Sequence, residues 1–277
     1  MANLVAGIKS MKLYSHIDRV YNELAELGKS GDVPLTAAEL SEFDQLHYHG
    51  TDAVDHAIHM IGIDKSTRVL EIGSGFGGPA RHVAHNTGTR ITALELQPAQ
   101  NRMASELTER CGLSANLTHV CGDILTCDWQ QQQFDAIVSW LAIFHIPERA
   151  RLLALAGDLL SSGGVFYTED LFSRQRFSQA ERAELASGLY AGHLPDLQTY
   201  QAEFEHAGFA LERVDDMSDD WTDFTTERLR DYRAGRARHV RVHGEPTYLA
   251  LEEFYELVNR HFRSGKLGGI RLLARKP

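Results

Sequence analysis

The sequence has little cysteine and proline, and it lacks any long apolar run. Among 277 residues there are 3 Cys and 7 Pro. The cysteines are odd in number and match no metal-binding spacing, and the chain start does not resemble a signal peptide. We therefore expect structural thiols, no metal site and a cytoplasmic location. No apolar stretch approaches the roughly 18 residues that a membrane-spanning helix needs, so membrane insertion is not expected. The cysteines are Cys111, Cys121 and Cys127.

Positive charge is also scarce. The chain has 28 Lys and Arg against 38 Asp and Glu, a net charge of −10. Nucleic-acid partners need clustered Lys and Arg, so this balance argues against them. An anionic small substrate stays possible, because one local Arg would suffice to bind it. The apolar share of 43% is ordinary for a globular protein and allows a sizeable core.

What the sequence does contain is a glycine-rich turn between a short aliphatic run and a helix-like stretch. The run Arg68–Ile72 includes the acid Glu71, and four glycines follow within the six residues 73–78. A strand, a glycine turn and a helix form the front edge of a doubly wound α/β sheet. Glycines in such a turn let the backbone approach a ligand closely. The segment therefore predicts a cradle for a nucleoside cofactor.

The glycine spacing alone does not identify the cofactor. Gly73, Gly75 and Gly78 also fit the dinucleotide pattern G-x-G-x-x-G. Glu71, however, would repel a pyrophosphate and attract an amino-acid ammonium such as that of S-adenosylmethionine. Glu95 ends the next predicted strand and could hold both hydroxyls of a ribose, which suits NAD and S-adenosylmethionine equally.

Two further strands end in polar residues. A third strand is expected to close at Asp123, whose carboxylate could accept from an adenine amino group while Ile124 packs against the ring. A fourth strand, residues 134–139, ends at Ser139, and His145 follows it. Because ligands of open α/β sheets bind outside the carboxyl ends of the strands, these residues are expected at one edge.

Strand and helix patterns alternate from residue 61 to about residue 170, which predicts a parallel sheet. Before it, residues 1–60 are expected to form a helical lid, with a helix over 11–27, a capping box at Thr36 and a helix capped by Thr51. Residues 61–277 are expected to form the cofactor-binding domain, with helical insertions at about 171–207 and 216–263. Within the second insertion we expect one helix over 221–241 and another over 249–263.

These motifs resemble the class I S-adenosylmethionine-dependent methyltransferases, small-molecule type, over about residues 60–277. The subgroup that the chain is most similar to includes the sarcosine/dimethylglycine, phosphoethanolamine and sterol methyltransferases. The resemblance implies a Rossmann-like α/β fold with a seven-stranded, mostly parallel sheet, helices on both faces and an N-terminal helical lid. It also implies a last strand that returns antiparallel beside the sixth. The stretches that carry it are 69–77, Glu95, 122–124, 134–138 and 159–166.

The same resemblance gives a set of candidate site residues. His145, at the end of the fourth strand, could deprotonate an acceptor, and Tyr14 could close over the sulfonium; both could also be packing residues. Predicted substrate-binding residues are His47, His49, Asp170 and Tyr190, each with a structural role as the alternative. Predicted cofactor-binding residues are Glu71, Gly73, Ser74, Gly75, Glu95, Leu96, Gln100, Asp123, Ile124, Ser139 and Leu141.

The predicted function is transfer of a methyl group from S-adenosylmethionine to a small molecule, with an amine nitrogen favoured. The alternatives are O- or C-methylation of a natural-product or lipid-like acceptor. A different class would be a non-catalytic S-adenosylmethionine-binding protein or a NAD-dependent oxidoreductase, since fold alone never settles function. A homodimer is possible.

Overall fold

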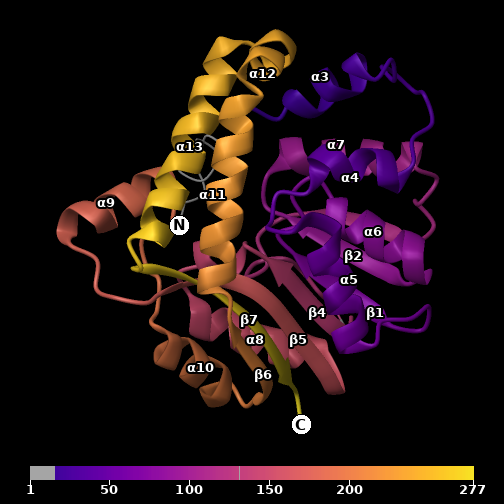
Figure 1. Cartoon of the computed structure of the whole chain (residues 1–277). Helices are drawn as coiled ribbons and strands as arrows, with labels where there is room; N and C mark the ends of the chain where they lie inside the picture. The colour runs from indigo at the N-terminus through magenta and orange to yellow at the C-terminus, as the bar shows by residue number, and fades with distance from the viewer. Residues whose placement is uncertain (1–15, 131) are drawn as a thin grey trace. The chain divides into compact units, whose positions relative to one another are not determined.

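The computed structural model describes residues 16–130 and 132–277, which fall into two compact units (Figure 1). The sheet unit comprises Asp32–Asp170, Gln198–Asp215 and Ile270–Pro277. The helical unit comprises Leu171–Leu197, Asp216–Gly269 and the described part of Met1–Gly31. Residues 32–60 thus cluster with the sheet, and a lid over residues 1–60 stays a prediction.

One seven-stranded sheet has the order β3-β2-β1-β4-β5-β7-β6. Neighbouring strands from β3 to β5 are all parallel. The last strand runs the other way. Gly163 near the start of β5 donates to Lys276 after β7, and Arg174 after β5 donates to Lys266 before β7. The predicted fold class is confirmed, including a final strand beside the sixth. The strands are β1 (Arg68–Ile72), β2 (Arg90–Glu95), β3 (Leu117–Cys121), β4 (Phe134–Trp140), β5 (Leu160–Ser173), β6 (Ala210–Asp216) and β7 (Leu267–Arg275).

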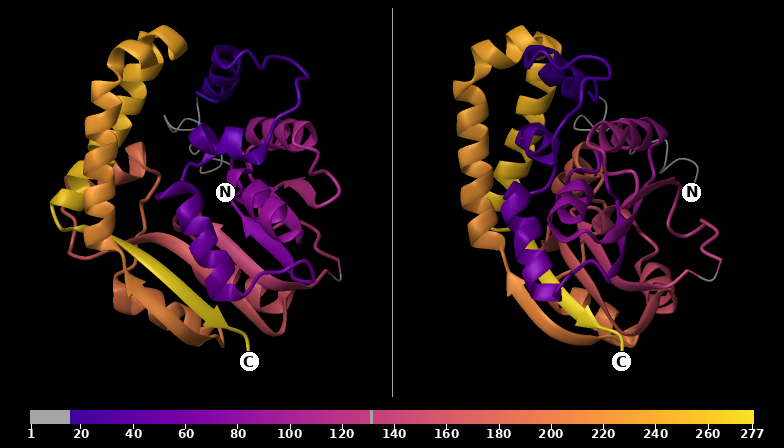
Figure 2. Two further views of the ribbon diagram at one scale, coloured as in Figure 1. Left: turned by 45° about the vertical axis from the view of Figure 1, so that its right-hand side comes forward. Right: turned by 90° about the vertical axis from the view of Figure 1, so that its right-hand side faces the viewer.

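Helices cover both faces of this sheet (Figure 2). On one face, residues of α5 and α6 share a buried core with alternate residues of β1, β4 and β5, among them Val138, Trp140 and Tyr167. On the other face, Phe166 packs edge-on against Phe204 of α10. The helices of this unit are α4 (Ala37–Asp44), α5 (Gly50–Ile61), α6 (Gly78–Thr87), α7 (Pro98–Arg110), the 3-10 turn η1 (Ile143–His145), α8 (Arg149–Leu159) and α10 (Leu197–His206).

In the helical unit, α11 and α13 lie side by side and run in opposite directions (Figures 1 and 2). Asn259 donates to Thr225 at one end, and Tyr232 stacks on Tyr248 at the other with ring centroids 5.1 Å apart. Both insertions predicted from the sequence contain helices. The helices are α3 (Arg19–Glu26), α9 (Gln179–Gly188), α11 (Ser218–Ala234), α12 (Arg236–His243) and α13 (Glu245–Arg263).

Three local expectations need correction. The predicted helix over 221–241 is interrupted at Gly235, where the chain turns and brings His239 onto the Tyr232 ring, 4.3 Å between centroids. A Cβ at Gly235 would come within 2.9 Å of the His239 ring, so a larger residue there would have to displace that ring. The third strand ends at Cys121, before Asp123. Helix α5 begins at Gly50 rather than after Thr51. The capping box at Thr36 is confirmed.

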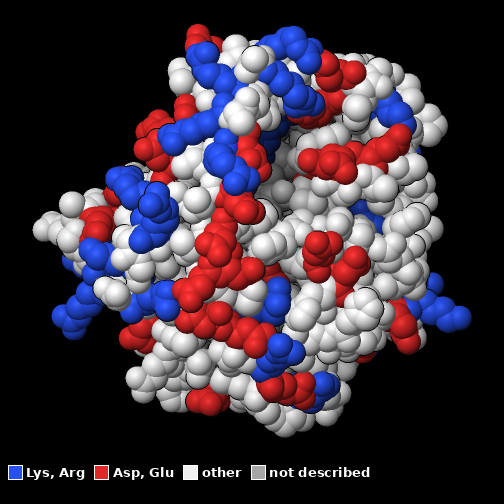
Figure 3. All heavy atoms as spheres, in the orientation of Figure 1, with Lys and Arg blue, Asp and Glu red and all other residues white. Residues whose placement is uncertain are grey.

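The surface mixes charges of both signs. On the face drawn in Figure 3, acidic and basic side chains are interspersed, without one continuous basic area. Within the described residues no helix has the length and apolar character to cross a membrane.

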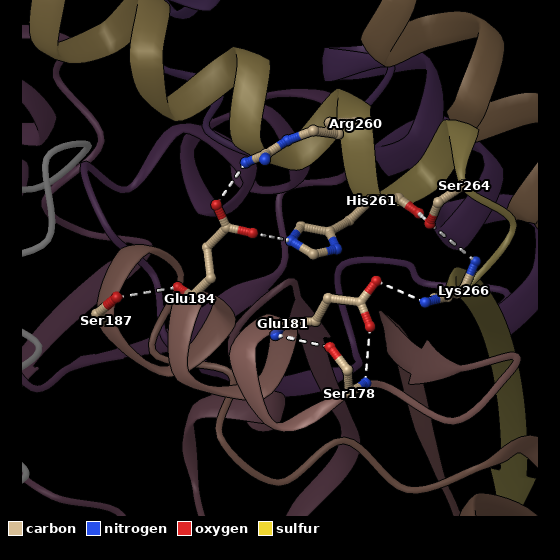
Figure 4. A network of polar contacts seen from close by, with 8 residues as sticks. All are labelled: Ser178, Glu181, Glu184, Ser187, Arg260, His261, Ser264 and Lys266. Carbon is tan, nitrogen blue, oxygen red and sulfur yellow. Dashed lines mark hydrogen bonds and ion pairs between the residues drawn. The ribbon is translucent and has the colours of Figure 1, made fainter.

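Ion pairs fasten α9 to the end of α13 (Figure 4). Glu184 accepts from Arg260 at 2.6 Å and from His261 at 2.9 Å. Glu181 accepts from Lys266 at 2.6 Å and from the backbone N–H of Ser178 at 2.7 Å, which closes a capping box at the start of α9. The Lys266 hydrogen bond is the main reason why the pKa of Glu181 is lowered to about 2.

This lowered pKa predicts acid sensitivity of the helical unit. A carboxyl group whose pKa is lower in the folded than in the unfolded chain stabilises the fold above its unfolded pKa, and this contribution is lost as the pH falls through the folded value. We expect the Tm to fall more steeply from pH 4.5 to pH 2 in the parent than in Glu181→Gln. Circular dichroism melts at pH 5, 4, 3 and 2 would measure this. Lys266→Met should flatten the curve in the same way, and parallel curves for all three proteins would contradict the assignment.

A fully buried ion pair holds the glycine turn in place. Arg81 of α6 and Asp44 at the end of α4 are 2.8 Å apart, with about 1% of each side chain exposed. Arg81 also donates to the carbonyl oxygens of Phe76, in the turn, and of Ala104, in α7. A Cβ at Gly77 would lie 2.9 Å from the Arg81 guanidinium, and φ there is +76°. The glycine therefore leaves room for the guanidinium.

Removing one member of this pair should lower the stability of the fold, because the remaining charge would stay buried without its partner. We expect Asp44→Asn to lower the free energy of unfolding by about 3–5 kcal/mol. The matched control is Asp135→Asn, which removes the exposed partner of Arg68 and should cost no more than about 1 kcal/mol. Urea unfolding of both variants provides the measurement. Equal losses of unfolding free energy in the two variants would mean that the buried pair stabilises the fold no more than the exposed pair does.

Candidate functional site

The carboxyl end of β1 brings Glu71 beneath the glycine turn. Its side chain is 2% exposed. The carboxylate accepts the backbone N–H of Ala80, but Oε2 has no hydrogen-bond partner among the described residues. Burial raises the pKa of Glu71 to about 8. An acid that is buried with one oxygen unsatisfied is suited to receive a positively charged ligand group.

The turn itself is shaped by close approaches. A Cβ at Gly73 would lie 2.3 Å from the side chain of Ala142, so the glycine lets the chain after β4 pass close to it. Gly75 has φ +54° and donates its N–H to Glu95 at 2.9 Å. Ser74 is 3% exposed, and its hydroxyl has no partner within the described chain.

Glu95 ends β2 on the same edge. Besides Gly75, its carboxylate accepts the backbone N–H groups of Leu96 and Gln97. Burial raises its pKa. Gln100, in the first turn of α7, is 1% exposed, and its Nε2 has no partner in the described part of the chain. The end of β2 and the start of α7 therefore present a fixed acid and, five residues later, an amide nitrogen without a partner among the described residues.

At the end of β3 a carboxylate shapes a turn, whereas at the end of β4 a hydroxyl links two strands. Asp123 uses one carboxylate oxygen to accept the N–H of Leu125, which forms a tight turn after β3. Ile124 is buried next to it, with 4% exposed. Ser139 is fully buried and donates to the carbonyl oxygen of Ile72 at 2.9 Å, so its hydroxyl ties β4 to β1.

The chain immediately after β4 has an unusual backbone. Leu141 has φ +52°, a conformation that is unfavourable for a branched side chain, and its N–H donates to the carbonyl oxygen of Glu169 at 2.8 Å. Such backbone conformations cluster at functional sites. His145 follows in η1, half-buried, with its ring 3.8 Å from that of Phe144.

Two histidines lie before α5. His47 is 5% exposed, and burial is the main cause that lowers its pKa to about 4, so the ring is neutral at neutral pH. Its Nε2 lies 2.9 Å from the Gly50 carbonyl oxygen, and its ring is 5.8 Å from that of Trp140. His49 is the N-cap residue of α5 and has φ +58°. The structure thus brings both histidines to the sheet unit's β4 end.

Asp170 has no exposed surface. One oxygen accepts from the Tyr200 hydroxyl at 2.8 Å, and the other accepts the N–H of Phe144 at 3.3 Å. Arg149 lies 3.7 Å from it and pairs with Glu203. These contacts connect the end of β5 to η1, so Asp170 is placed to position the turn that carries His145. Its role in substrate binding stays a prediction.

The residue before it, Glu169, was not among the candidates from the sequence. It is 1% exposed, and its Oε1 accepts from Tyr167 at 2.7 Å and from Arg271 at 2.8 Å. Its Oε2 has no partner within the described residues. The signal that could have found it is an acid at the carboxyl end of a parallel strand, as for Glu71 and Glu95.

Two candidates are not among the described residues of the sheet unit. Tyr14 is outside the described residues. Tyr190, with φ +53°, belongs to the helical unit, between α9 and α10. Both stay predictions. Within the described part of the chain, no group of three or more His, Cys, Asp and Glu side chains could hold a metal ion.

Part of the chain is similar to a known protein family. Residues 69–164 match a family model described as a methyltransferase domain. This part of the chain is a methyltransferase domain. It spans β1 to the start of β5 and includes the glycine turn, Glu71, Glu95 and Asp123.

Two curated proteins are examples of relatives that are similar to this chain. The sterol 24-C-methyltransferase of Aspergillus fumigatus is 28% identical over 167 residues, which are 58% of this chain and 44% of that protein. The glycine/sarcosine/dimethylglycine N-methyltransferase of Actinopolyspora halophila is 28% identical over 163 residues, 57% of this chain and 28% of that protein. The chain therefore matches less than half the length of these curated relatives.

Among solved structures, phosphoethanolamine N-methyltransferase 2 of Haemonchus contortus superposes with a TM-score of 0.76 at 18% identity. The match covers 84% of this chain and 54% of that one. Its structure contains S-adenosylhomocysteine and phosphomonomethylethanolamine. At this identity the likeness shows the shared fold. Together with the domain match, it confirms the resemblance to class I S-adenosylmethionine-dependent methyltransferases.

The residues of the methyltransferase domain fit S-adenosylmethionine. Three polar atoms at the ends of β1 and β2 are buried without partners in the described chain: Glu71 Oε2, Ser74 Oγ and Gln100 Nε2. They offer acceptors and a donor of the kind that an ammonium, a carboxylate and ribose hydroxyls need. Glu95 is suited to the ribose and Asp123 to the adenine amino group, through the carboxylate oxygen that Leu125 leaves open.

The raised pKa of Glu71 predicts proton release on cofactor binding. At pH 7 the carboxyl is mostly protonated, and a neighbouring ammonium would lower its pKa and expel the proton. We expect release of up to about one proton per molecule of S-adenosylhomocysteine bound at pH 7. Calorimetric titrations in phosphate and in Tris would show it as a difference in apparent enthalpy. In Glu71→Gln the difference should vanish; if it persisted, the proton would come from another group.

Proposed function

We propose that this protein transfers a methyl group from S-adenosylmethionine to the nitrogen of a small amine. The observation that supports it best is the charge distribution at the carboxyl edge of the sheet unit. Glu71, Glu95 and Asp123 gather there. The nearby arginines are already engaged with carboxylates: Arg81 with Asp44, Arg149 with Asp170 and Glu203, and Arg271 with Glu169.

This arrangement favours ligands that are cationic over ligands that are anionic. A phosphate or carboxylate on the acceptor would need a cation that is not already paired. A sulfonium and an amine are instead attracted by the acids and by aromatic faces such as those of Trp140 and Tyr167, whose rings lie 6.1 Å apart. The N-methyltransferases among the similar proteins add support for nitrogen as the acceptor atom.

The residues of this chain mainly align the reactants. Bound S-adenosylmethionine supplies a methyl group on a positively charged sulfur, and transfer to a neutral amine forms an N–C bond while the S–C electron pair stays on sulfur. In the proposal, Glu71 and Glu95 hold the donor in one orientation, which converts an encounter of two molecules into a reaction within one complex. His145, carried by η1 and braced through Asp170, takes a proton from a protonated acceptor before the transfer.

A carbon acceptor is the second candidate, because the sterol 24-C-methyltransferase is among the similar proteins. The two are separated by supplying S-adenosylmethionine with a ¹³C-labelled methyl group and a panel of small amines, phenols and sterols. The chemical shift of the new methyl in the product differs between N-, O- and C-methyl groups. Label on amines would support the proposal, and label on sterol carbon alone would replace it with the second candidate. Binding of NAD without S-adenosylmethionine binding would exclude both.

Replacement of His145 should lower turnover without weakening cofactor binding. His145→Ala should lower kcat about 100-fold, as for loss of a general base. The dissociation constant for S-adenosylhomocysteine should stay within about twofold, because no cofactor contact is assigned to the ring. His85→Ala, on the exposed side of α6, is the control and should change neither. A matched loss of cofactor affinity in His145→Ala would assign the residue to packing.

A further inference from the structure

In the described chain, two complementary polar atoms are buried on paired residues of β4 and β5. Trp140 and Glu169 are paired neighbours on these adjacent parallel strands. The indole Nε1–H, a donor, and the carboxylate Oε2, an acceptor, are both buried, and neither has a hydrogen-bond partner among the described residues. A buried polar atom without a partner destabilises the fold, so two on neighbouring strands require an explanation.

The surrounding contacts fix both groups in place. Tyr167 and Arg271 hold Oε1 of Glu169 at 2.7 and 2.8 Å, which leaves Oε2 as the oxygen that is open to a ligand. The Trp140 ring packs between those of His47, at 5.8 Å, and Tyr167, at 6.1 Å. These side chains lie on the sheet face that α5 and α6 cover, since Trp140 and Tyr167 share the buried core there. The pair is therefore rigid.

The position of this pair suits the acceptor rather than the donor. The cofactor candidates Glu71 and Glu95 end β1 and β2, whereas β4 and β5 are the next strands on the other side of β1. A ligand that spans the ends of β1 to β3 would direct its reactive end toward β4. An acceptor that meets it there would lie over the ends of β4 and β5.

We infer that Glu169 and Trp140 bind the methyl acceptor, as a primary or secondary amine with a hydrogen-bond acceptor atom next to its nitrogen. The N–H of the amine donates to Glu169 Oε2, and the neighbouring oxygen or nitrogen accepts from Trp140 Nε1. This inference rests on the proposed function and narrows its substrate class.

The carboxylate also has a role in the transfer itself. As the N–C bond forms, the positive charge moves from sulfur to the amine nitrogen, and no proton needs to leave in that step. The N–H that donates to Oε2 thereby becomes part of an ammonium, and its hydrogen bond to the carboxylate strengthens. An interaction that is stronger in the transition state than in the ground state raises kcat. A tertiary amine has no N–H for Oε2, so it should be a poor acceptor.

The test compares Glu169→Gln with the parent on amines that differ only in their methyl groups. A scaffold that the parent methylates, found among small amino alcohols and diamines, is supplied as primary, secondary and tertiary amine. We expect kcat/KM of Glu169→Gln to fall about 10- to 100-fold on the first two, mainly through kcat. The parent should turn over the tertiary amine at least about tenfold more slowly than the secondary one.

Two further measurements keep the result interpretable. Trp140→Phe removes the Nε1 donor together with part of the buried ring, and it should weaken calorimetric binding of the amine to the S-adenosylhomocysteine complex, with a smaller effect on kcat. The control Glu212→Gln removes the carboxylate of an exposed Glu–Arg pair, with Arg275, and should match the parent. Unchanged affinity of each variant for S-adenosylhomocysteine shows that the fold is intact.

The outcomes separate the two proposals. If the parent methylates no amine but does methylate phenols or sterols, amine methylation fails and this inference fails with it. If the parent methylates amines and both Glu169→Gln and Trp140→Phe match it in turnover and amine binding, only the inference is wrong. Preference of the parent for the tertiary amine would overturn it as well.

Discussion

The buried pair of Arg81 and Asp44 is the constraint on which the cofactor side of the sheet unit depends. Four segments meet at this guanidinium: the end of α4, the glycine turn, the start of α6 and the middle of α7. A charge inside a protein stays there only when its partner and its hydrogen bonds are all in place. The pair therefore favours one arrangement of these segments, and the turn that follows Gly73 and Gly75 is held through the carbonyl oxygen of Phe76.

The carboxyl ends of the strands likewise hold buried charges that are paired. Acids lie at the carboxyl ends of β1 and β2 and in β5 beside the end of β4, and the arginines near them are already paired with carboxylates. What is left for a ligand is hydrogen-bond capacity without a partner in the described chain, at Glu71 and at Glu169. An edge of this kind suits a reaction in which the methyl donor that binds is a cation and the methylated product that dissociates is also a cation.

Much of this could be predicted from the sequence because it depends on neighbours in the chain. The glycine turn, the acids at strand ends and the Thr36 capping box are local patterns. The break at Gly235 was missed because a helical sequence pattern allows one glycine. The stacking of His239 on Tyr232, which accompanies the turn, is a contact that the pattern does not contain. Asp44 and Arg81 are 37 residues apart, so no local pattern pairs them. Glu169 was passed over for Asp170, although the alternation of a strand places the two on opposite faces.

Residues in the left-handed backbone region have a practical consequence. His49, Leu141 and Tyr190 are three of the four non-glycine residues with positive φ in the described chain, and all three were candidates for the site on other grounds. Each such residue costs about 1–2 kcal/mol relative to glycine, so stability alone does not favour it. Selection of this protein for heat resistance would therefore accumulate glycine or asparagine at these positions first. A thermostability screen, which needs no knowledge of the acceptor, would in this way show at which of these positions the strained backbone can be relieved.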